Sequence, residues 1–203
     1  MSCSISCVVF DLNGALFDAA EWHFDSLNLA LQEHLKIDIS HTNHRTKFFG
    51  MRTAAKLDLL NIPLALREEI CKTKRRHMQS LVESKLRPNR DKICMLESLK
   101  EMNIYTACIT NSSKDTAVDV LRKLWLIDLL DTVVTSDYLD QPKPNPEGYL
   151  LAMDSLGVEP ESVLAFEDDN IGIEAAQAAK VRKAVLIDST CDVNFNYVKK
   201  HLG

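Results

Sequence analysis

The sequence predicts an α/β protein whose parallel sheet of short strands is covered by helices on both faces. Two observations lead to this prediction. From about residue 88 onward, short apolar runs alternate with segments whose apolar residues recur at helical spacing. A further apolar run lies near the N-terminus, and a long stretch with helical patterns only separates it from the others. The expected strands are 5–10, 105–109, 132–135, 163–166 and 184–187.

The expected helices form two groups on either side of Pro88-Asn89, a pair of residues typical of a chain turn. The earlier group follows the first strand and contains no convincing strand of its own. We therefore expect a core domain of residues 1–18 and 88–203, with an inserted helical cap domain of residues 19–87. The expected helices are 20–36, 53–60 and 64–84 in the insert, and 92–102, 114–124, 145–156 and 171–179 in the core.

Composition excludes several classes of protein. With 203 residues, 46% of them hydrophobic, the chain can bury one sizeable core and a smaller lobe. The net charge is −5, and the densest basic run, 72–77, is expected to be a solvated helix face, so we expect no nucleic-acid partner. No apolar run approaches the ~18 residues of a membrane span. The scattered cysteines and the lack of a signal-peptide pattern favour a cytoplasmic protein, with a monomer as the default expectation.

Polar residues follow four of the expected strands, at the edge where ligands bind in open parallel sheets. Asp11 follows the first strand, and Thr110-Asn111-Ser112 follows the second. Lys143 comes after the third strand, and Glu167-Asp168-Asp169 follow the fourth. Carboxylates from two strand ends suit Mg²⁺, which prefers hard oxygen ligands. Hydroxyls, helix-start N–H groups and a lysine suit phosphate, so the edge predicts a magnesium and phosphate site.

Each of these segments also has an ordinary structural interpretation. Asp168 and Asp169 could cap the helix that starts near Ile171, and residues 110–112 could be a simple turn. Lys143, between two prolines, could be a surface lysine. A purely structural explanation of this edge would require all of these separate interpretations to hold at once, at successive strand ends. A shared functional site accounts for all of the polar residues together and is therefore favoured.

The order of motifs resembles that of the haloacid dehalogenase (HAD) superfamily. "FDLNGALFD", "ITNSS", "KPNPEGYLLAM" and "FEDDNIGIEAAQAA" are similar to its four motifs, and the resemblance as a whole spans residues 8–188. "DAAEWHFDSLNLAL" resembles the β-phosphoglucomutase-like phosphatases, and "HRTKFFGMRTAAKLDLL" matches their cap more loosely. The resemblance implies a Rossmann-like core with a helical cap. It also implies a Mg²⁺-dependent phosphatase that acts on a small phosphorylated metabolite, either a sugar phosphate or a nucleotide.

The resemblance also implies a role for each matching residue of the metal site. Asp11 would be the nucleophile, forming an aspartyl phosphate, and a ligand of Mg²⁺. Asn13 would offer its backbone carbonyl to the metal. Asp168 would hold the metal directly or through water, with Glu167 as a further ligand.

Other matching residues would bind the phosphorylated substrate. Thr110 would hydrogen-bond the phosphoryl group, helped by backbone amides near Asn111 and Ser112. Lys143 would bridge that group and the nucleophile. His23 stands where the mutase-like members place a histidine near the substrate, although it could equally pack on its helix.

Two other residues of the insert are less informative in the sequence. The spacing of His41 and His44 is more typical of a polar loop than of a metal site.

Asn13 departs from the family pattern. Family phosphatases usually have an Asp here, which protonates the leaving oxygen and then activates the water that breaks the aspartyl phosphate. An amide cannot exchange a proton at neutral pH, and losing a general acid–base typically costs ~10²–10⁴ in rate. Ala15 also replaces the usual Thr. The sequence thus predicts an assembled site that lacks the usual proton shuttle.

Three hypotheses remain open about activity. One is a slow or specialised phosphatase in which water, His23 or Asp18 transfers the proton. Another is an inactive pseudophosphatase that binds a phosphometabolite or a protein partner. A third is an active phosphatase whose Asn13 was introduced to trap an intermediate. A phosphonatase would need an imine-forming lysine in the cap, and nothing in the sequence singles out Lys56 for that role.

Overall fold

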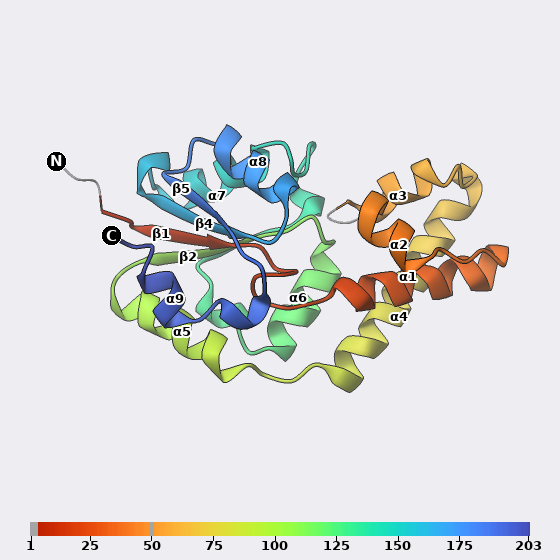
Figure 1. Ribbon diagram of the computed structural model, residues 1–203, viewed down its shortest axis with the longest axis horizontal. Coiled ribbons are helices and arrows are strands. Elements are labelled where there is room, and N and C mark those ends of the chain that lie inside the picture. Colours follow the sequence, from red (N-terminus) through yellow and green to blue (C-terminus); the bar gives the residue numbers. More distant parts are fainter. Residues whose placement is uncertain (1–3, 49–50) are drawn as a thin grey trace. The chain divides into compact units, whose positions relative to one another are not determined.

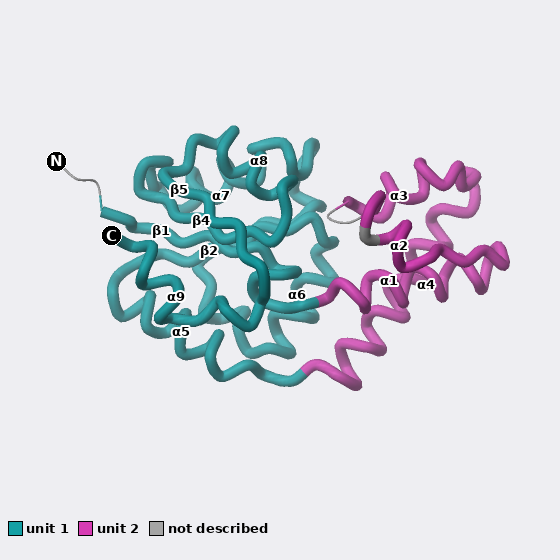
Figure 2. Tube along the Cα trace, in the orientation of Figure 1, with its two compact units in different colours: residues 1–18, 87–203 teal, residues 19–86 magenta. Residues whose placement is uncertain are grey.

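The computed structural model describes residues 4–48 and 51–203. The chain forms two compact units (Figure 2). The first unit comprises residues 1–18 and 87–203, and the second comprises residues 19–86. Each unit has its own buried apolar cluster.

The first unit contains a five-stranded parallel sheet in the order β3-β2-β1-β4-β5. The predicted parallel sheet is therefore confirmed, and the observed strands agree with the expected ones to within about two residues at their ends. The central strand β1 pairs with β2 on one side and with β4 on the other. The strands are β1 Cys7–Phe10, β2 Tyr105–Ile109, β3 Thr132–Val134, β4 Val163–Glu167 and β5 Lys183–Leu186.

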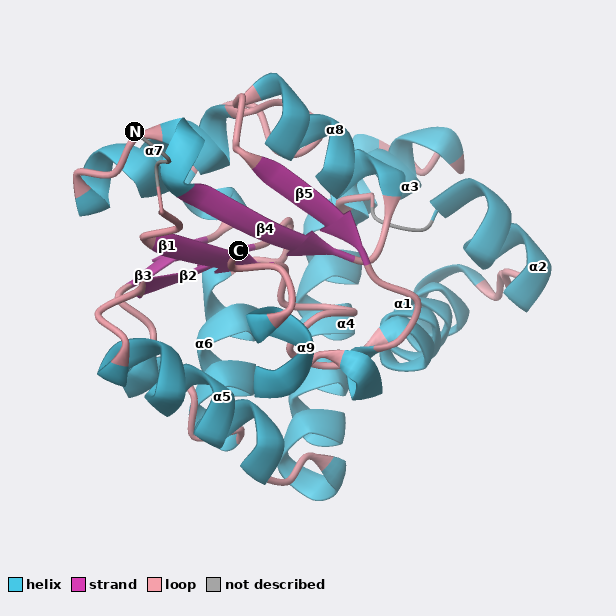
Figure 3. Ribbon diagram, turned by 60° about the vertical axis from the view of Figure 1, so that its left-hand side comes forward, coloured by secondary structure: helices cyan, strands magenta, loops and turns pink. Residues whose placement is uncertain are grey.

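Helices cover both faces of this sheet (Figure 1, Figure 3). On one face lie α7 (Glu147–Leu156) and α8 (Asn170–Ala178). On the other lie α5 (Arg90–Glu101), α6 (Lys114–Lys123) and α9 (Phe195–Lys199). The sequence reasoning missed α9, because five residues carry too little periodicity to be recognised. Short 3₁₀ segments at Ile127–Leu129, Ser136–Tyr138, Pro160–Ser162 and Thr190–Asp192 complete the connections.

The inner strands β1, β2 and β4 are almost entirely buried, because their successive side chains alternate between the two helix layers. Val9 and Ala107 belong to the cluster that packs on α7 and α8. Phe10 and Phe166 point to the other layer and stack with ring centroids 5.5 Å apart. The Tyr197 ring of α9 lies 5.9 Å from that of Phe166. This packing fixes the strands whose ends carry the candidate site.

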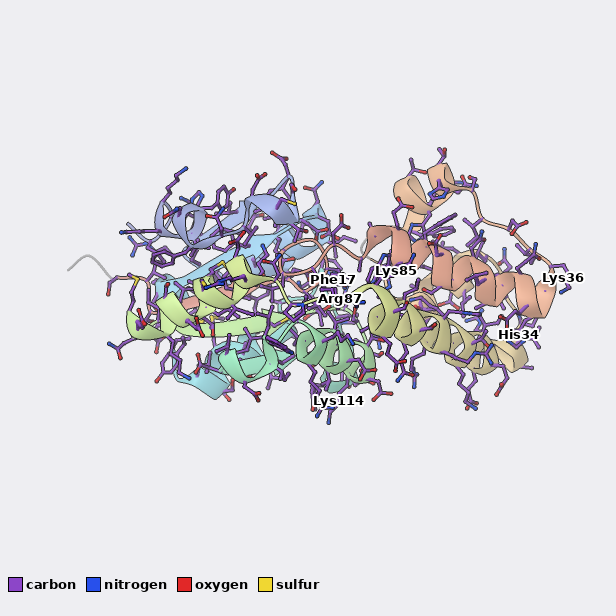
Figure 4. All side chains as sticks on the ribbon, turned by 90° about the horizontal axis from the view of Figure 1, so that it is seen from below. Phe17, His34, Lys36, Lys85, Arg87 and Lys114 are labelled. Atoms are coloured by element: carbon purple, nitrogen blue, oxygen red, sulfur yellow. The ribbon has the colours of Figure 1, made fainter. Side chains whose placement is uncertain are left out.

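The second unit is helical. It consists of α1 (Ala20–Leu35), α2 (His41–Asn43), a π-helical turn (His44–Phe48), α3 (Thr53–Leu59) and α4 (Leu64–Lys85). Helices α1 and α4 pack together, and His34, labelled in Figure 4, hydrogen-bonds Thr73 with its Nε2 atom 2.8 Å from Oγ1. No helix among the described residues is long and apolar enough to cross a membrane.

The expectation of a polar loop at His41 and His44 was wrong. This segment is helical, and His44 is buried with 4% exposure. The cause is aromatic packing, since the Phe24 and Phe48 rings lie 5.4 Å and 6.5 Å from the His44 ring. The spacing of polar residues alone could not reveal these contacts.

Candidate active site

The ends of three neighbouring strands meet at the ammonium group of Lys143. Lys143 Nζ donates to Asp11 Oδ1 at 2.8 Å, just past the end of β1. It also donates to Glu167 Oε1 at 2.7 Å, at the end of β4, and to the Ile109 carbonyl at 2.7 Å, at the end of β2. Its side chain is 5% exposed. Burial lowers the pKa of Lys143, but the carboxylates of Asp11 and Glu167 outweigh burial and hold it above its usual value, so the lysine is charged.

Three carboxylates gather at this edge of the sheet. Oxygen atoms of Asp11, Glu167 and Asp168 lie within 4.8 Å of one another. Burial raises the pKa of Asp168 to about 8, and the charges of Asp11, Asp169 and Glu167 add to this effect. Burial also raises the pKa of Glu167 to about 7, although Lys143 opposes it. One lysine thus faces several carboxylates, and such a set of hard oxygen donors fits a divalent cation such as Mg²⁺.

Glu167 is fixed by a second partner besides the lysine. The hydroxyl of Tyr149, in α7, donates a hydrogen bond to Glu167 Oε1. Tyr149 is fully buried in the apolar layer between α7 and the sheet. Sequence reasoning missed this residue because its apolar neighbours indicate core packing, and only the structure brings its hydroxyl to the carboxylate.

The turn after Asp11 brings its backbone close to Asp168. Gly14 has a φ of +106°, a conformation that residues with a side chain rarely adopt. A Cβ atom at this position would lie 2.0 Å from Asp168 Oδ2, inside contact distance. The glycine is therefore required both by the backbone conformation and by the close approach of the carboxylate.

The segment after β2 forms a turn beside Lys143. The Ser112 N–H donates to Thr110 Oγ1 at 3.1 Å. The Asn111 side chain holds the Lys143 backbone, because its Oδ1 accepts from the Lys143 N–H at 3.1 Å and its Nδ2 donates to the Lys143 carbonyl at 3.2 Å. The Asn111 side chain therefore fixes the loop that delivers Lys143, while the contribution of its backbone amide to phosphate binding stays a prediction.

Asn13 is held by a hydrogen bond that a carboxylate could not donate. Its Nδ2 donates to Ser112 Oγ at 2.9 Å. Its Oδ1 is buried and accepts no hydrogen bond from the described residues. The amide thus lies at the site with one partner and one unpaired acceptor atom.

Asp169 and Asp168 differ in role. Asp169 Oδ1 accepts from the Gly172 N–H at 2.7 Å and caps the start of α8. The helix-capping interpretation therefore applies to Asp169, whereas the Asp168 carboxylate faces Gly14 and the other two carboxylates.

His23 belongs to the second unit and lies on α1 among positive or potentially positive groups. Burial lowers its pKa well below the usual value, with further lowering by Lys74, Lys56 and His44. Lys56 is 5% exposed and its Nζ lies 3.4 Å from His44 Nε2. Lys74 Nζ donates to Thr53 Oγ1 at 2.8 Å. This buried basic cluster, which the sequence did not indicate, distinguishes Lys56 from the solvated lysines around it.

The fold and the strand-end residues together define the class of protein. A parallel Rossmann-like sheet carries an aspartate after its central strand, a lysine paired with it, and acidic residues after the neighbouring strand. Residues 8–186 match the family model described as haloacid dehalogenase-like hydrolase. The chain belongs to this family, and the family predicted from the sequence is confirmed.

Relatives with related descriptions cover most of the chain. A phosphorylated carbohydrates phosphatase of Thermotoga maritima is 29% identical over 182 residues, covering 88% of this chain and 83% of that protein. A β-phosphoglucomutase of Bacillus subtilis is 31% identical over 186 residues, covering 86% and 80%. The crystal structure of a β-phosphoglucomutase from Clostridium difficile matches with a TM-score of 0.82 at 23% identity, covering 97% and 96% of the two chains.

Proposed function

We propose that this protein is a Mg²⁺-dependent phosphatase of small phosphorylated metabolites, with sugar phosphates or nucleotides as the substrate class. The observation that carries this proposal is the convergence of Asp11, Lys143 and Glu167 at three strand ends. The descriptions of the relatives, a phosphorylated carbohydrates phosphatase and a β-phosphoglucomutase among them, support the same substrate class.

Asp11 is the nucleophile in this proposal. Its Oδ attacks the phosphorus atom, the bond to the leaving oxygen breaks, and an aspartyl phosphate forms on Asp11. Lys143 holds the carboxylate at 2.8 Å and offsets the negative charge that approaches with the substrate. Thr110 and the amides of the 110–112 turn hydrogen-bond the phosphoryl oxygens.

A divalent cation fits the carboxylate cluster. Asp11, Asp168 and Glu167 would hold Mg²⁺ together with the backbone carbonyl of Asn13. Burial raises the pKa of Asp168, and the neighbouring carboxylates, which add to this effect, would attract a cation. When bound, the metal supplies positive charge beside the transferred phosphoryl group.

Proton transfer is the weak step of this site. The leaving oxygen needs a proton, and the water that hydrolyses the aspartyl phosphate must lose one. Asn13 can do neither, so solvent water supplies and accepts these protons and turnover is slow. His23, in the cap formed by residues 19–86, contributes to substrate binding.

A second function follows from the same residue. The Asn13 amide is already hydrogen-bonded to Ser112, so the site is suited to hold a phosphorylated ligand without hydrolysing it. This alternative is a pseudophosphatase that binds a phosphometabolite or a protein partner.

A panel of phosphorylated metabolites, assayed for phosphate release with and without Mg²⁺, tests the proposal. We expect slow, Mg²⁺-dependent release that Asp11→Asn abolishes, because the substitution removes the nucleophile and its pairing with Lys143. Asp154→Asn, at an exposed position of α7, is the matched control and should keep the rate. Release that survives Asp11→Asn would contradict the nucleophile, and ligand binding without any release would favour the alternative.

A further inference from the structure

The turn that carries Asn13 and Gly14 is held from outside the carboxylate cluster. The Gly14 N–H donates to the Phe17 carbonyl at 2.6 Å. The Gly14 carbonyl accepts a hydrogen bond from Thr190 Oγ1 at 2.5 Å. Thr190 begins the 3₁₀ segment that follows β5, so it reaches the turn from 176 positions away in the sequence.

Lys92 of α5 holds this 3₁₀ segment in turn. Its Nζ donates to the Thr190 carbonyl at 2.7 Å and also to the Val193 carbonyl. Lys92 is 1% exposed. Burial lowers its pKa to about 8. The two hydrogen bonds of this lysine tie the Thr190 segment to α5.

The hydrogen bonds of Gly14 restrain the two peptide planes beside it, and the first of these planes contains the Asn13 carbonyl. In a planar trans peptide the C=O and the following N–H point in opposite directions. Because the Gly14 N–H is bound to Phe17, the Asn13 carbonyl is directed away from the Phe17 oxygen. Because Thr190 binds the Gly14 carbonyl, it fixes the peptide plane that follows Gly14. Neither of the two peptide planes beside Gly14 can therefore turn freely.

We propose that Thr190, braced by Lys92, is a positioning residue that holds the Asn13 carbonyl in the orientation needed to bind a divalent cation. This inference rests on the proposed function, in which that carbonyl is a ligand of Mg²⁺. A purely structural contact would lower stability when removed, whereas a positioning contact must also weaken metal binding in a protein that is still folded.

The test is calorimetric titration of the full chain with Mg²⁺. Thr190→Val keeps the shape of the side chain and removes its donor, and we expect about tenfold weaker Mg²⁺ binding, in line with the loss of a contact that orients a ligand. Thr190→Ser restores the hydroxyl and should bind Mg²⁺ like the unsubstituted protein. Lys92→Met should weaken binding in the same direction, and circular dichroism establishes that each variant is folded.

The outcomes separate this inference from the proposed function. Equal Mg²⁺ affinity of Thr190→Val and the unsubstituted protein overturns the positioning role alone. Absence of Mg²⁺ binding in the unsubstituted protein overturns both the positioning role and the metal site. The expected affinity series without phosphate release from any substrate supports the positioning role and contradicts the phosphatase.

Discussion

At the scale of single residues, Gly14 shows how one backbone position shapes the site. We expect Gly14→Ala to destabilise the fold and to abolish Mg²⁺ binding, because a Cβ there would displace the Asp168 carboxylate. Gly157→Ala is the matched control: Gly157 also has a positive φ, +64°, but no atom lies within 4 Å of its added Cβ. It should cost roughly 1–2 kcal/mol of stability and leave Mg²⁺ binding intact. Calorimetry and urea unfolding measure both, and Mg²⁺ binding by Gly14→Ala would contradict the close approach.

The acidic and basic residues at the strand ends are the part of the site that sequence reasoning could find. Asp11, Lys143 and Glu167 follow predicted strands, so their convergence follows from the parallel topology. The hydrogen bond from Tyr149 to Glu167 and the distinct roles of Asp168 and Asp169 could not be predicted, since they depend on side-chain packing between distant segments.

At the scale of elements, the strands and long helices were predictable and the short ones were not. Apolar runs and helical periodicity locate β1 to β5 and α4 because many residues contribute to each pattern. The five-residue helix α9 and the π-helical turn at His44–Phe48 lack such a pattern. The turn forms because aromatic rings pack against His44, a tertiary effect that single-sequence patterns do not contain.

Lys56 of α3, whose buried side chain contacts His44 in the π-helical turn, predicts that the free energy of unfolding depends on pH. Burial lowers the pKa of Lys56 to about 7 in the folded protein, from 10.5 when unfolded. Between these values the unfolded state binds more protons, so the free energy of unfolding rises with pH, by at most about 1.4 kcal/mol per pH unit from this group.

We expect Lys56→Met to remove this part of the dependence and to stabilise the protein most near pH 7. Urea unfolding of the variant and the unsubstituted protein at pH 7, 8 and 9 measures it. Lys85→Met, at an exposed position that ends α4, is the control and should show a difference that does not vary with pH. A stability difference for Lys56→Met that grows as pH rises would contradict the assignment.

At the scale of the whole molecule, the chain forms two compact units, and the residues of the second, 19–86, lie in the sequence between β1 and the other strands of the sheet. The core contains the proposed nucleophile, lysine and metal ligands in one unit. The proposed substrate-binding residue His23 lies in the other unit, together with the buried basic cluster of Lys56, His44 and Lys74. Under the proposed function, the first unit supplies the chemistry and His23 of the second unit contributes to substrate binding.

We propose a site that is assembled and lacks only the group that moves protons. The measurement that tests it most directly is Mg²⁺-dependent phosphate release by Asn13→Asp and by the unsubstituted protein, on the same substrate panel over a range of pH. Restoring a carboxylate at this position should raise the rate by about 10²–10⁴, the usual contribution of a general acid–base. No rise in Asn13→Asp, in a folded protein that binds Mg²⁺, would contradict the account.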